Sequence, residues 1–163
     1  MRCVDSSLEP RMLDKFKEVV FTFERPMIKN GKPTIILADD HDGVRKRVSE
    51  LLEADCCILA EVGDGHSSVE AAEKFKPDIV ILDLSMPVLN GIQAAREIKR
   101  RGLKCKIVFL TVQEDVDYVE IANEMGASYI LKARMHVDLP LAINRALAGG
   151  VLVSPFSTPR VTS

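Results

Sequence analysis

Long apolar runs are absent from this 163-residue chain, and none approaches the ~20 residues that a membrane-spanning helix needs. The N-terminus has no uninterrupted apolar stretch before a small-residue cleavage site, so nothing marks a secretory signal peptide. An excess of one charge is also absent, because 22 Lys and Arg stand against 24 Asp and Glu. A net charge of -2 gives no broad attraction to nucleic acid or to an anionic membrane. We therefore expect a cytoplasmic protein that does not bind nucleic acid or membranes directly.

Cysteine is sparse, and Cys3, Cys56, Cys57 and Cys105 lack the spacing of a metal site. The adjacent pair opens an apolar stretch, which favours buried, reduced thiols over a disulfide framework. The length suits one domain with extensions.

From residue 33 onward, strand-like and helix-like segments alternate. Short runs rich in Ile, Leu and Val predict five strands, at 34–38, 57–62, 78–82, 106–110 and 128–131. Apolar residues recur at helical spacing in five further segments, at 44–52, 69–75, 92–98, 118–125 and 139–147. Strands that are apolar throughout are typical of a parallel sheet covered on both faces, so the pattern predicts an α/β fold.

Residues 1–32 break this alternation and are expected to be an N-terminal extension to a domain at 33–153. Part of the extension has an apolar helical stripe, yet residues 19–23 also alternate like a strand. It is either a partner or dimer contact or a loosely held extension, and a true start at Met27 is a further alternative. Residues 154–163 are rich in Ser, Thr and Pro and predict an irregular tail.

Acidic residues stand where two of the predicted strands end. Asp39 and Asp40 follow the first strand, and Asp83 follows the third, 44 residues beyond Asp39. Ligands of open α/β sheets bind outside the carboxyl ends of the strands, so these carboxylates are expected to meet. Crowded carboxylates repel one another unless a cation intervenes, and Mg²⁺ suits an oxygen-rich site that handles phosphoryl groups. Asp83 is the candidate nucleophile, because a carboxylate can form an acyl phosphate.

Two more polar residues end the later strands. Thr111 offers a hydroxyl and Lys132 a compact positive charge to the same phosphoryl group. Taken alone, Thr111 equally suits a helix N-cap. Lys132 alone suits a solvated strand end better than a catalytic role. His41, after the acidic pair, either contacts the metal or begins the first helix.

These residues lie in motifs that resemble the receiver domains of response regulators: ILADDH at 36–41, DIVILDLSMPVLNG at 78–91, FLTV at 109–112 and YILK at 129–132. The resemblance covers about 33–153 and is strongest to the NarL/FixJ subgroup, although the chain stops before the LuxR-type helix-turn-helix such proteins usually carry. It implies a doubly wound, flavodoxin-like parallel sheet of five strands in the order 2-1-3-4-5, with five helices.

The resemblance also implies roles for the strand-end residues. Asp83 corresponds to the phosphoacceptor, Asp39 and Asp40 to Mg²⁺ ligands, and Lys132 to the lysine that contacts the phosphoryl group. Ser85 corresponds to the residue whose backbone carbonyl completes the metal site. The phosphoryl group comes from a histidine kinase, a phosphotransfer protein or a small phosphodonor, and the domain catalyses only its own phosphorylation and dephosphorylation.

The same resemblance makes Thr111 and Tyr129 the switch pair. Thr111 is expected to turn toward the phosphoryl oxygen and Tyr129 to turn inward, which alters the adjoining surface. Ser85 and Gln113 are expected to flank the path of the attacking water and to tune the lifetime of the phosphoryl group.

The chain departs from the receiver pattern just before Tyr129, where the loop is one residue shorter than usual. Because the spacing from Tyr129 to Lys132 is kept, we expect the strand to hold its phase and the end of the preceding helix to absorb the loss. Ala133 replaces a Pro that many receivers have, so no cis peptide is expected there.

Several functions fit these observations. The first is a stand-alone phosphoacceptor that signals through protein binding, either as a monomer or as a homodimer. The second is the receiver fragment of a DNA-binding regulator, and the third is a phosphorylation-independent interaction domain. A Mg²⁺-dependent phosphohydrolase is disfavoured, because Ser85 stands where such enzymes carry a second Asp.

Overall fold

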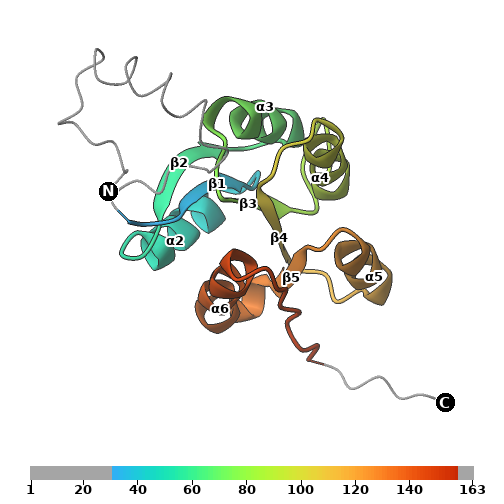
Figure 1. The fold of residues 1–163 in the computed structure, drawn as a ribbon. Coiled ribbons are helices and arrows are strands. Elements are labelled where there is room, and N and C mark those ends of the chain that lie inside the picture. The colour runs from blue at the N-terminus through green and yellow to red at the C-terminus, as the bar shows by residue number, and fades with distance from the viewer. Residues whose placement is uncertain (1–30, 158–163) are drawn as a thin grey trace, which may run out of the picture.

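The computed structural model describes residues 31–157, which form one sheet of five parallel strands and five α-helices (Figure 1). The strands are β1 (Thr34–Ala38), β2 (Cys57–Val62), β3 (Ile79–Asp83), β4 (Lys106–Thr111) and β5 (Ser128–Leu131). The helices are α2 (Asp42–Leu52), α3 (Gly65–Phe75), α4 (Gly91–Arg100), α5 (Val116–Glu124) and α6 (Met135–Leu147), the last preceded by a 3-10 turn, η1 (Lys132–Arg134).

The strand order is β2-β1-β3-β4-β5, which confirms the predicted topology. Helices α3, α4 and α5 cover one face of the sheet, and α2 and α6 cover the other (Figure 1). The inner strands are buried on both faces, which explains why their sequences are apolar without alternation. None of the helices within residues 31–157 is long and apolar enough to cross a membrane.

Three of the five predicted strands have the predicted bounds, and the other two end one residue later. The third strand also begins one residue later than expected, and the carboxylate of Asp78, the residue just before it, is a hydrogen-bond acceptor. Its Oδ2 accepts hydrogen bonds from the backbone N–H (2.8 Å) and the hydroxyl (3.1 Å) of Thr34, so it joins the start of β1 to the start of β3. The later ends make Asp83 and Thr111 the last residues of their strands.

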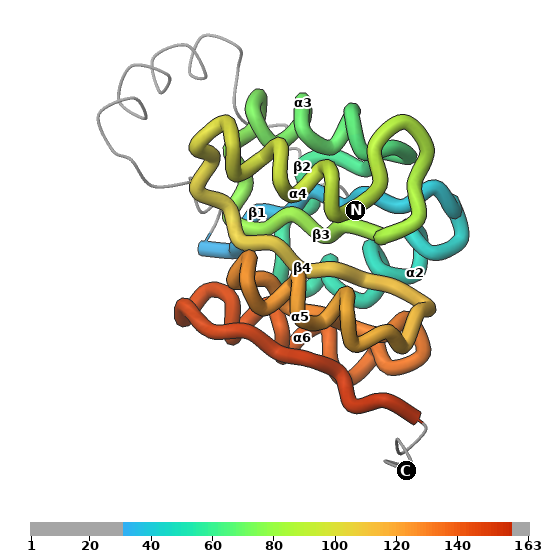
Figure 2. Tube along the Cα trace, turned by 90° about the vertical axis from the view of Figure 1, so that its right-hand side faces the viewer, coloured from blue at the N-terminus to red at the C-terminus, as the bar shows by residue number. Residues whose placement is uncertain are grey.

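The predicted N-terminal extension lies outside the described residues, apart from its last two positions. Of the predicted tail, residues 154–157 are described and have no helix or strand. Ser154 is nevertheless buried, and this segment lies at the β5 side of the sheet, past α5 and α6 (Figure 2).

Candidate functional site

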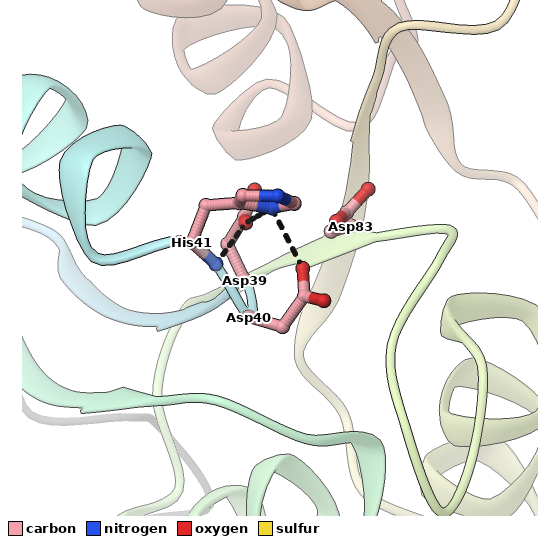
Figure 3. A group of neighbouring side chains, drawn as sticks. All are labelled: Asp39, Asp40, His41 and Asp83. Carbon is pink, nitrogen blue, oxygen red and sulfur yellow. Dashed lines mark hydrogen bonds and ion pairs between the residues drawn. The ribbon is translucent and has the colours of Figure 1, made fainter.

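Three carboxylates converge at the carboxyl ends of β1 and β3 (Figure 3). Asp39 directly follows β1 and is 1% exposed, while Asp83 ends β3 and is 4% exposed. Asp40 is exposed at the rim. Because β1 and β3 are hydrogen-bonded neighbours, residues 44 apart in sequence become adjacent in space, as the sequence predicts.

His41 begins the first helix, which is one of the two roles that the sequence left open. It is the N-cap residue of α2, and its backbone N–H donates to Asp39 Oδ1 at 2.9 Å. Its ring turns toward the acidic pair, with Nδ1 2.9 Å from Asp40 Oδ1 and 3.4 Å from Asp39 Oδ1 (Figure 3). The ring is therefore a neighbour of the site and not only the start of a helix.

The donor set fits a hard divalent cation. One ligand atom each from Asp39, Asp40, His41 and Asp83 can be chosen so that all four atoms lie within 4.8 Å of one another. Carboxylate oxygens are the ligands that Mg²⁺ prefers, and it commonly takes one or two of them together with water and phosphate. Ser85 is exposed beside Asp83, and its backbone N–H lies 3.4 Å from Asp83 Oδ1.

Lys132 reaches the same pocket from the other side. Its Nζ lies 2.7 Å from Asp39 Oδ2 and 3.4 Å from Asp83 Oδ2. The contact between Lys132 and Asp39 is an ion pair whose angles do not meet those of a hydrogen bond. Lys132 is 14% exposed, so the solvated strand end that the sequence also allowed is not what the structure has.

The shortened loop before Tyr129 does not displace this lysine. Only three residues connect α5 to β5, and Gly126 adopts a φ of 66°, which glycine tolerates without strain. The N–H of Ala127 closes the helix end on the carbonyl of Ala122 at 2.8 Å. The helix end thus absorbs the missing residue, and Tyr129 pairs with Phe109 of β4 in regular register. No described peptide bond is cis, in line with Ala133.

Burial shapes the acid chemistry of Asp83. Its pKa is raised, first because the carboxyl is withdrawn from water and second because the Asp39 carboxylate is close. The positive charge of Lys132 and the Ser85 N–H act in the opposite direction. Asp83 therefore carries its negative charge less readily than a fully solvated aspartate does.

Thr111 ends β4, and Tyr129 is the second residue of the neighbouring strand β5, where it pairs with Phe109. Thr111 is 1% exposed, and its Oγ1 accepts a hydrogen bond from the Gln113 N–H at 3.1 Å. Tyr129 is fully buried, and its hydroxyl donates to the Gln113 carbonyl at 2.7 Å. Burial is the main cause that raises the pKa of Tyr129 to about 12. Both switch candidates are therefore linked through one loop residue, and Tyr129 already points inward.

Sequence inspection missed the backbone support of Asp83. A Cβ atom on Gly91 would lie 2.3 Å from the Asp83 carbonyl oxygen, and one on Gly65 would lie 2.1 Å from the Leu89 carbonyl oxygen. Only glycine allows these close approaches, which hold the loop after β3 against the strand end and against α3. The glycines are visible in the sequence, but what they approach is a tertiary relationship.

This fold and this pocket define a class of protein. The model of the response regulator receiver domain matches residues 35–143, so the chain belongs to that family. Among curated relatives, the nitrate/nitrite response regulator protein NarL of Escherichia coli is 34% identical over 136 residues, which are 81% of this chain and 63% of NarL. The transcriptional regulatory protein PdtaR of Mycobacterium tuberculosis is 40% identical over 116 residues, covering 70% of this chain and 56% of PdtaR.

Solved structures agree with this placement. A two-component response regulator of the LuxR family from Aurantimonas sp. has a TM-score of 0.71 and 32% identity, over 76% of this chain and 91% of that one. The present chain thus spans less than two thirds of the length of the curated relatives named above.

Proposed function

We propose that this chain is a stand-alone receiver that accepts a phosphoryl group on Asp83 from a histidine kinase or phosphotransfer protein and signals in the cytoplasm through protein binding. The observation that carries the proposal is the position of Lys132 between Asp39 and Asp83. A lysine buried with two carboxylates contributes little net stability, because desolvation of the three charges offsets their attraction. The position of Lys132 suits a site that receives the negative charge of a phosphoryl group.

The transfer needs a nucleophile, charge neutralisation and little else. An oxygen of Asp83 attacks the phosphorus atom, the P–N bond of a phosphohistidine donor breaks, and its electron pair returns to the imidazole. Asp39 and Asp40 would hold Mg²⁺, with Asp83 and the Ser85 carbonyl, and the ion supplies charge neutralisation when bound. Lys132 and the Thr111 hydroxyl contact the remaining phosphoryl oxygens, and Gln113 and Ser85 border the path of the water that later cleaves the P–O bond.

Turnover beyond self-catalysed phosphorylation and dephosphorylation is not expected. Ser85, two residues after the nucleophile, cannot act as the acid/base that an aspartyl phosphohydrolase uses.

Labelling with acetyl phosphate in Mg²⁺ tests the proposal. We expect one phosphoryl group per chain in the wild type and in Asp55→Asn, a matched change at an exposed turn, and none in Asp83→Asn. A folded wild type that stays unlabelled would leave a phosphorylation-independent interaction domain in its place. Equal labelling of Asp83→Asn would overturn the assignment of Asp83 as the phosphoacceptor. Size measurement with and without phosphorylation tests dimer formation in the same samples.

The relatives favour a second candidate. NarL and PdtaR are regulators longer than this chain, and PdtaR is by name a transcriptional regulatory protein. The receiver portion of such a regulator would have the same pocket and a different output. A native reading frame that continues past Ser163 into a helix-turn-helix would decide for this candidate.

A further inference from the structure

The chain turns back after α6 and covers the open edge of β5. We call residues 152–157 the C-terminal strap. The Tyr129 N–H donates to the Leu152 carbonyl at 2.9 Å, and the Ser154 N–H donates to the Tyr129 carbonyl at 2.8 Å. Val153 therefore forms a parallel bridge with Tyr129. The strap satisfies edge groups of β5 that would otherwise pair with water or with another chain.

Ser154 fixes the first half of the strap. It is 1% exposed, its Oγ accepts from the Leu131 N–H at 3.1 Å, and its hydroxyl donates to Asp138 Oδ2 at 2.6 Å. Asp138 is held in turn by Arg134 Nε at 2.8 Å. Both Leu131 and Arg134 lie within two residues of Lys132, so this half of the strap is tied to the segment that carries the lysine.

The second half of the strap contacts Tyr129 and the loop that follows Thr111. The Phe156 ring packs on the Tyr129 ring, with centroids 6.5 Å apart and planes at 59°. The Ser157 N–H donates to Glu114 Oε1 at 2.9 Å. Tyr129 holds Gln113 through its hydroxyl, and Gln113 holds the Thr111 hydroxyl oxygen. A short series of packed groups therefore joins Phe156 to Thr111.

Resting on the proposed function, we propose that the strap is a positioning device of the phosphorylation site, with Phe156 as its main positioning residue. By packing on Tyr129 and holding Glu114, the strap keeps the loop after β4 in one arrangement, with Thr111 at the pocket. Thermodynamic linkage then requires the reverse effect: a phosphoryl group held by Thr111 and Lys132 stabilises the docked strap by the same free energy.

The test uses the full chain and beryllofluoride, a phosphoryl mimic, at saturating Mg²⁺. We expect Phe156→Ala to weaken beryllofluoride binding about fivefold or more, the lower end of typical coupling between two sites. Mg²⁺ affinity measured alone should stay unchanged, because the strap does not contact Asp39 or Asp40. Phe156→Tyr keeps the ring and should restore tight binding. Phe75→Ala removes a partly exposed ring on α3 and is the control.

Hydrogen exchange supplies a second readout. In the wild type, beryllofluoride should slow exchange of the Ser154 and Ser157 amides, and in Asp83→Asn it should not. If the wild type binds the mimic and Asp83→Asn does not, yet Phe156→Ala binds as tightly as the wild type, the role of the strap is refuted and the proposed function stands. If the wild type does not bind the mimic at all, both fail together.

Discussion

Lys132 Nζ lies 2.7 Å from Asp39 Oδ2, with 14% of the lysine side chain and 1% of the aspartate side chain exposed. The pair joins the segment after β5 to the end of β1, across two intervening strands. The ammonium group thus contacts the two buried carboxylates of the pocket, whereas Asp40 is exposed at its rim. The positive charge of Lys132 attracts a phosphoryl group and repels a metal ion. Phosphoryl transfer and metal binding in this pocket can therefore be separated by changing Lys132.

Lys132→Gln should affect these two functions in opposite directions. Loss of the positive charge should slow labelling by acetyl phosphate by about tenfold or more, since charge stabilisation at the transferred group is typically worth several kcal/mol. Mg²⁺ affinity should rise, because a competing cation no longer pairs with Asp39. Labelling rates and calorimetric Mg²⁺ titration measure the two effects. Lys106→Gln, at the exposed opposite end of β4, should change neither. A parallel loss of both activities would mean that Lys132 only maintains the fold.

Asp83→Asn should stabilise the metal-free protein at neutral pH. The pKa of Asp83 is raised by burial and by Asp39, so the folded state binds its proton more readily than the unfolded state does. Its contribution to stability is therefore present at low pH and is lost as the pH rises through the raised pKa. We expect the variant to be more stable by about 1 kcal/mol at pH 7, a usual size for one substitution.

The advantage of Asp83→Asn should shrink as the pH falls toward 3.8, the ordinary value for this group. Urea unfolding in a chelator, compared across this range, measures the difference. Equal stability at pH 7 would show that Lys132 fully compensates the buried charge.

Mg²⁺ should stabilise the folded protein through the same carboxylates. A ligand at 100 times its Kd adds about 2.7 kcal/mol when it binds only the folded state. Asp40 is exposed, so Asp40→Asn should leave metal-free stability nearly unchanged while raising the Mg²⁺ concentration needed for the shift in Tm. Asp55→Asn is the matched control at an exposed turn. If Asp40→Asn and the wild type respond to the same Mg²⁺ concentrations, Asp40 is not a ligand.

The strand ends were predictable because burial makes the parallel strands of this fold nearly continuous apolar runs. Asp39 and Asp83 stand out as the first charges after such runs, and their meeting follows from the parallel sheet. The N-cap role of His41 was also readable, whereas the turn of its ring toward Asp40 was not, because a rotamer depends on neighbours in space.

The strap was the main feature that sequence alone did not reveal. Ser154 opens a segment rich in Ser, Thr and Pro, a composition typical of a tail, and nothing local indicates that its hydroxyl is buried against Asp138. Its partners come from β5 and α6, and a contact between residues so far apart has no periodic signature.

Gly91→Ala tests the backbone support of the phosphoacceptor. The new Cβ would lie 2.3 Å from the Asp83 carbonyl oxygen, so either α4 or the end of β3 must move. We expect a loss of about 2 kcal/mol, in the range of overpacked cores, together with slower labelling of Asp83. Gly43→Ala on α2 meets no atom within 4 Å and should be neutral or stabilising by up to about 1 kcal/mol. Similar stabilities of the two variants would contradict the tight contact.

Val88 holds the loop after β3 in a strained turn that a substitution can relieve. Its φ is 69°, a left-handed value that costs a β-branched residue about 1–2 kcal/mol, while its side chain is 78% exposed and gains little from packing. Asparagine tolerates this conformation, so Val88→Asn should raise the free energy of unfolding by about 1 kcal/mol. Val112→Asn, at a valine 75% exposed without positive φ, should bring no such gain. Urea unfolding of both variants decides, because an equal effect would come from placing an amide in water instead of an exposed valine and not from relieved strain.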